Sequence, residues 1–76
     1  MFVTVYNLTR MMDDNIKYLN EAYETRENHP KEVFDNYVKK MNYKLENQFE
    51  KLCEISCNER LIKRYKKKIE VAINQN

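Results

Sequence analysis

The chain has 76 residues, with 14 Lys and Arg against 12 Asp and Glu, a single proline and no glycine. Because glycine and proline supply most tight turns, this composition excludes a many-stranded sheet and favours one small all-α domain over residues 1–76. No apolar run approaches the roughly 20 residues of a membrane span, and the sequence shows no secretory leader pattern. We therefore expect a cytoplasmic protein without membrane contact.

The first segment, MFVTVY, alternates β-branched and aromatic residues, a pattern typical of a short strand. We expect this strand over residues 1–6. Because the sequence offers no second strand, we expect it to pair with its twin in a dimer, to add to the sheet edge of a partner, or to be disordered or helical when alone.

A first amphipathic helix is expected over about 9–28. Its apolar stripe is formed by Leu8, Met12, Ile16, Leu19 and Tyr23, and is widened by Met11 and Ala22. Spacings of three and four residues place these side chains on one helix face, and the charged residues between them fall on the opposite face.

A second, longer helix is expected over about 30–57, since Pro30 suits a first helical turn and Asn28 or His29 suits the cap. Its stripe is formed by Phe34, Val38, Met41, Leu45, Gln48, Leu52 and Ile55. A stripe of this length exceeds what a small domain covers, so we expect these seven residues to mediate self-association as a homodimer. Gln48 would set the register, and Gln48→Leu should raise stability.

A third amphipathic helix is expected over about 58–74. The Ser56-x-x-Glu59 spacing predicts a capping box at its start, with Asn58 as a competing cap. The apolar residues that would bury it are Leu61, Ile62, Tyr65, Ile69, Ala72 and Ile73. Without a glycine at the junction, the sequence allows this helix either to continue the second with a kink or to fold back on it.

The third helix is strongly basic, with six basic and two acidic residues between Glu59 and the end of the chain. On the second helix an exposed tyrosine is expected among lysines. The candidate contact residues for a macromolecular partner are therefore Arg60, Lys63, Arg64, Lys67 and Lys68, together with Tyr43, Lys40 and Lys44. They suit a protein partner or, as the alternative, RNA or DNA phosphates, whereas a purely solvated face would have no ligand.

Residues for catalysis or metal binding are few. His29 is the single histidine, no glycine-rich loop can cradle phosphate, and Cys53 and Cys57 lack two further zinc ligands. We expect Cys53 to be a small core residue. The sequence therefore predicts a non-enzymatic regulatory or inhibitory protein without metal or cofactor, and its Lys, Asn, Ile and Tyr content fits a virus-encoded, AT-rich origin.

Overall fold

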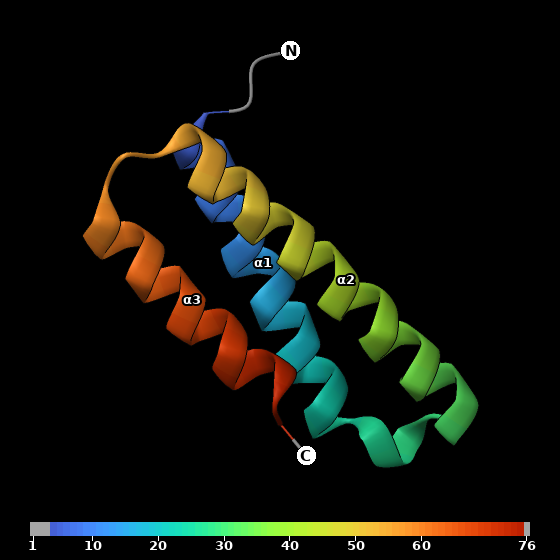
Figure 1. Cartoon of the computed structure of the whole chain (residues 1–76). Helices are drawn as coiled ribbons and strands as arrows, with labels where there is room; N and C mark the ends of the chain where they lie inside the picture. Colours follow the sequence, from blue (N-terminus) through green and yellow to red (C-terminus); the bar gives the residue numbers. More distant parts are fainter. Residues whose placement is uncertain (1–3, 76) are drawn as a thin grey trace.

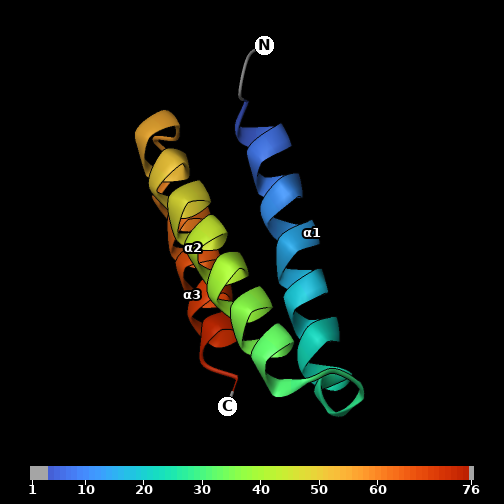
Figure 2. The ribbon, with the colours of Figure 1, turned by 90° about the vertical axis from the view of Figure 1, so that its right-hand side faces the viewer.

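A computed structural model describes residues 4–75, and this part of the chain contains helices and no strand, which confirms the predicted all-α fold class. Helix α1 spans Val5–Glu24, the short 3-10 helix η1 spans Arg26–Asn28, α2 spans Lys31–Ile55 and α3 spans Glu59–Ile73. The helices form an up-down-up bundle of 41 × 26 × 15 Å (Figure 1). Figure 2 shows α1 beside α2, with α3 behind α2.

Helix α1 begins at Val5, so the strand prediction is wrong over residues 4–6, and its remaining part, residues 1–3, lies outside the described residues. The hydroxyl of Thr4 caps the helix by accepting the Asn7 N–H at 3.1 Å. Val5 packs against the core although β-branched residues favour strands. Burial of this apolar side chain and the cap outweigh the weak local preference.

The turn between α1 and α2 contains η1 and two extended residues. Pro30 is the cap residue of α2, and no side chain caps this helix, so the predicted cap at Asn28 or His29 is wrong. The rings of Tyr23 and Phe34 meet edge to face across the turn, with centroids 5.2 Å apart and planes at 84°. Such aromatic pairs add about 0.5–1.5 kcal/mol beyond burial and tie the two helix ends together.

Helix α3 folds back on α2 through residues 56–58. Ser56 and Asn58 are extended, and no residue among 4–75 has a positive φ, so this reversal needs no glycine. The Asn58 side chain accepts the Leu61 N–H at 3.1 Å and caps α3, while the Ser56 hydroxyl accepts the Asn58 N–H at 3.1 Å. Asn58 therefore takes the cap position, and Ser56 shapes the turn instead of forming the capping box.

The core lies along the axis of the bundle. Its buried apolar residues are Leu8, Met12, Leu19, Met41, Leu45, Leu52, Tyr65, Ile69 and Ala72. Each fully buried Leu or Met contributes about 1.5–3 kcal/mol relative to exposure. Within the described residues, no helix is long and apolar enough to cross a membrane.

The apolar stripe of α2 packs inside the chain rather than against a second copy. Met41, Leu45, Gln48 and Leu52 are buried, and the other three predicted contact residues, Phe34, Val38 and Ile55, are half-buried. Helices α1 and α3 cover the stripe that we expected to be free. Self-association through these seven residues stays a prediction.

Candidate functional site

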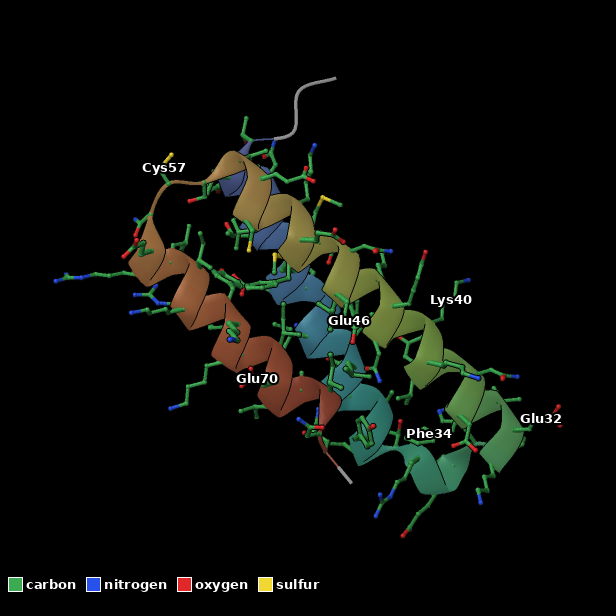
Figure 3. The ribbon with its side chains drawn as sticks, viewed as in Figure 1. Glu32, Phe34, Lys40, Glu46, Cys57 and Glu70 are labelled. Atoms are coloured by element: carbon green, nitrogen blue, oxygen red, sulfur yellow. The ribbon has the colours of Figure 1, made fainter. Side chains whose placement is uncertain are left out.

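Among the described residues, the side chains that could bind a metal do not form a cluster. Over residues 4–75, no three His, Cys, Asp or Glu side chains gather in a way that would hold a metal ion. Cys53 and Cys57 are free thiols and both are exposed, so the expectation that Cys53 is a core residue is wrong. Cys57 lies in the turn between α2 and α3 (Figure 3). The candidate sites are therefore surfaces, of which the bundle presents two.

The first surface is the basic face of α3. All five predicted contact residues on this helix are exposed: Arg60, Lys63, Arg64, Lys67 and Lys68. The last three also line a groove of about 840 Å³ between α3 and α1. The α1 wall of this groove carries three carboxylates, from Asp13, Glu21 and Glu24. The inner edge of the basic face therefore meets opposite charge from the same chain.

One of these carboxylates holds α3 to α1. Asp13 accepts a hydrogen bond from the Tyr65 hydroxyl at 2.9 Å and pairs with the Lys68 ammonium at 3.3 Å. The Lys68 ammonium also lies 4.8 Å from the centre of the Tyr65 ring, within the range of a cation–π contact. Burial raises the pKa of the Tyr65 phenol, and the hydrogen bond to Asp13 and its charge raise it further. Lys68 thus has partners within the bundle and is less available to a ligand.

Acidic residues also lie on the other side of α3. A hollow between α3 and α2 is lined by Lys66, Glu70 and Glu46 around an apolar floor. Glu46 on α2 and Glu70 on α3 are labelled in Figure 3. The cations of α3 therefore form a narrow ridge with carboxylates along both edges. Such a ridge has a weaker field than an uninterrupted basic patch.

The second surface lies between α1 and α2, and it holds most of the exposed large apolar side chains. It consists of two separate hollows, one of about 290 Å³ near the α1–α2 turn and one of about 660 Å³ further along, which we together call the α1–α2 groove. The exposed large apolar residues that line it are Met11, Tyr18, Val33, Tyr37 and Tyr43. Outside the groove, the described residues expose only Tyr6 and Val71 in this class.

This groove also contains the remaining predicted contact residues. Lys40, Tyr43 and Lys44 line its larger hollow, together with Lys51. Lys40 projects from the edge of α2 away from α3 (Figure 3). The structure therefore divides the predicted contact residues into two surfaces, the α3 ridge and the α1–α2 groove.

The α1 side of the groove was not predicted from the sequence. Met11 was interpreted as widening the core stripe, yet its side chain is 50 % exposed, and Tyr18 is also 50 % exposed. Met11 and Tyr18 are seven residues apart, which places them on one helix face beside the core stripe. That spacing is the one signal in the sequence that could have identified them as a surface pair.

A buried amide pair fixes how α1 and α2 face each other below the groove. The Asn15 side-chain N–H donates to the side-chain oxygen Oε1 of Gln48 at 2.9 Å, and both residues are buried. Gln48 was predicted as a polar position in the stripe, but Asn15 was not predicted at all. The expectation that Gln48→Leu raises stability is revised, because that change would leave the Asn15 amide without its acceptor.

Comparison with protein-family models, with curated proteins and with solved structures finds no match for this chain.

Proposed function

We propose that this protein acts by stoichiometric, non-catalytic binding to a protein partner, whose activity it regulates or inhibits. The observation that carries the proposal is the gathering of five of the exposed large apolar side chains along the α1–α2 groove. Scattered exposed apolar residues are normal, whereas a contiguous apolar patch rimmed by polar groups is typical of a protein interaction site. Tyrosine and methionine are also enriched in such interfaces.

A nucleic-acid partner is the second candidate, and the α3 ridge is the surface that favours it. Arg60, Lys63, Arg64 and Lys67 are exposed and form no ion pair with any carboxylate among residues 4–75. Several phosphates could be contacted by such a row. The carboxylates along both edges of the ridge would repel a phosphate backbone, which is why we place the protein partner first.

Capture of the partner from cells that naturally make the protein tests this proposal with two matched double variants. Tyr18→Ser with Tyr37→Ser alters the groove, while Lys63→Glu with Lys67→Glu alters the ridge. We expect the groove variant to lose the captured protein and the ridge variant to keep it, with and without nuclease.

Salt gives an independent readout in the same experiment. Binding through apolar contacts should persist between low and moderate ionic strength, whereas binding through several phosphates should weaken steeply. A ligand that is lost on nuclease treatment, on salt addition and on reversal of the ridge charges would overturn the proposal in favour of nucleic acid.

A further inference from the structure

We propose that the α1–α2 groove accepts one amphipathic helix of the partner, with carboxylates at one end of its contact face and bulky apolar side chains at the other. This inference rests on the proposed function and specifies the partner's chemistry. The carboxylates would lie over Lys40, Lys44 and Lys51, and the apolar side chains over Tyr18 and Tyr37. The groove therefore defines both the kind of ligand and its direction.

The length of the groove matches a helix. The residues that line it on α2 run from Val33 to Lys51, a span of roughly 27 Å at 1.5 Å per residue. An occupant helix of about 18 residues would cover this span. Two adjacent helices present ridges and grooves into which a third helix packs readily. A peptide bound as a β-strand would instead need an open sheet edge, and residues 4–75 contain no strand.

The charges along the groove are uneven, and this sets the direction of the occupant. Three lysines and no acidic residue line the larger hollow. The smaller hollow is lined by one acid, Glu21, among apolar and aromatic side chains. An acidic segment is therefore favoured only at the end of the groove near Lys51.

The lysines at that end are largely available to a ligand. Among residues 4–75, neither Lys40 nor Lys44 forms an ion pair, while Lys51 pairs with Glu54 at 3.4 Å. The side chains of Lys51 and Glu54 are 49 % and 61 % exposed, so this pair is weak and readily exchanged. A partner carboxylate would gain a counter-charge without first breaking a strong internal contact.

The apolar part of the groove has the right composition for anchoring a helix. Tyr18 is 50 % exposed and Tyr37 is 39 % exposed, so each still has ring surface to bury. Met11 lies in the larger hollow beside the lysines and has a flexible side chain that adapts to different partner surfaces. Aromatic anchors that become buried contribute strongly to binding, while charges at the edge of a contact set orientation and association rate.

Selection from a phage-displayed library of amphipathic helices of about 18 residues, with one face randomised, tests the inference on the full chain. We expect the wild-type protein to enrich helices with Asp or Glu clustered at one end of the randomised face and bulky apolar residues at the other. Tyr18→Ser with Tyr37→Ser should weaken an enriched helix by at least about tenfold.

Reversing the charge of two groove lysines tests whether the lysines select the acidic end of the helix. Lys40→Glu with Lys44→Glu should change the selected end from acidic to basic. Lys63→Glu with Lys67→Glu is the matched control, because it reverses two exposed lysines at the same spacing on α3 and should leave the selection acidic. Circular dichroism establishes that each variant keeps the helical content of the parent.

Each of the other outcomes overturns the inference. Enriched helices without acidic residues, but sensitive to Tyr18 and Tyr37, would overturn the charge assignment and leave a protein-binding groove. Enriched helices that ignore both groove variants would place their contact elsewhere. No enrichment at all would remove the helix as occupant, while the proposed function would still be judged by partner capture from cells.

Discussion

Replacing the buried amide pair with apolar residues of the same shape tests how the bundle is held in register. Asn15 and Gln48 are only 7 % and 8 % exposed, and their hydrogen bond measures 2.9 Å. Leu matches the shape of Asn, and Met matches that of Gln. Asn15→Leu or Gln48→Met alone removes the hydrogen bond and leaves one buried amide unpaired, which costs about 1–3 kcal/mol.

The double variant should behave differently from the sum of the single ones. With both amides replaced, no polar group is left unpaired, so the free energy of unfolding should return to within about 1 kcal/mol of the wild type or exceed it. The two single costs add up to about 2–6 kcal/mol, so the coupling between the two sites should be at least about 1 kcal/mol. Urea unfolding followed by far-UV circular dichroism measures all four proteins.

A second Asn–Gln pair in the same chain is the matched control. Gln75 donates to Asn20 at 2.6 Å on the surface, so Asn20→Leu with Gln75→Met removes the same residue types from an exposed contact. Its coupling should stay below about 0.5 kcal/mol, as is usual for surface changes. Equal coupling in the two pairs, or stabilisation by Gln48→Met alone, would refute the view that the inner pair is a buried, mutually satisfied contact.

Four further predictions concern single features of the bundle. Because the pKa of Tyr65 is raised, the hydroxyl should stabilise the fold fully below pH about 10 and progressively less as pH rises through the folded pKa. Tyr65→Phe should therefore lower the free energy of unfolding by about 0.5–1.5 kcal/mol at neutral pH, and the difference between the two proteins should disappear in unfolding curves at alkaline pH. The side-chain Oδ1 of Asn42 is buried without a hydrogen-bond partner among the described residues, so Asn42→Leu should raise the free energy of unfolding by about 1 kcal/mol in urea unfolding. A loss of stability would contradict this. Asn58→Ala should cost about 1 kcal/mol and Asn58→Gly only a few tenths, and equal thermal shifts would contradict a side-chain cap. Light scattering at micromolar concentration tests self-association: a 9.4 kDa species alone would contradict the predicted dimer.

The helices could be predicted because their apolar residues repeat at the helical period. The predicted spans of about 30–57 and 58–74 agree closely with α2 at Lys31–Ile55 and α3 at Glu59–Ile73, whereas the first helix, predicted over about 9–28, spans Val5–Glu24. The N-terminal segment was predicted as a strand because local propensity was the only signal over six residues. Packing of Val5 against the core and the cap at Thr4 override that propensity, and neither is visible in a local pattern.

The interior polar pair shows why the core could be predicted only in part. Gln48 fits the α2 stripe by its spacing, but the stripe gives no indication of which helix will cover it. Asn15 lies on the same face of α1 as Leu8, Met12 and Leu19 by its spacing, but its polar side chain would ordinarily be placed on the surface. Only the antiparallel approach of α1 to α2 brings the two amides within hydrogen-bonding distance, so neither the pair nor the intramolecular use of the stripe follows from sequence periodicity.

The exposure of the predicted contact residues could be predicted from the sequence, but the surface to which each one belongs could not. The sequence identified exposed basic residues on two helices and a tyrosine among lysines. Whether those residues share a surface depends on how the helices are arranged around the core. In the bundle, Lys40 and Lys44 line the α1–α2 groove, whereas Arg64 and Lys67 line the groove between α1 and α3.

The net charge of +2 is a poor guide to where a ligand binds, because acidic residues border some of the basic residues and not others. The cations of α3 are the most numerous, but Asp13 pairs with Lys68 and further carboxylates border the ridge. The lysines of the α1–α2 groove are fewer, yet no acidic residue lines their hollow. A ligand gains most from charges that have no counter-charge nearby and from apolar surface that is still exposed. Lys40 and Lys44 in the α1–α2 groove, which form no ion pair among the described residues, lie beside such apolar surface, so we place the less basic of the two surfaces first as the candidate for the partner.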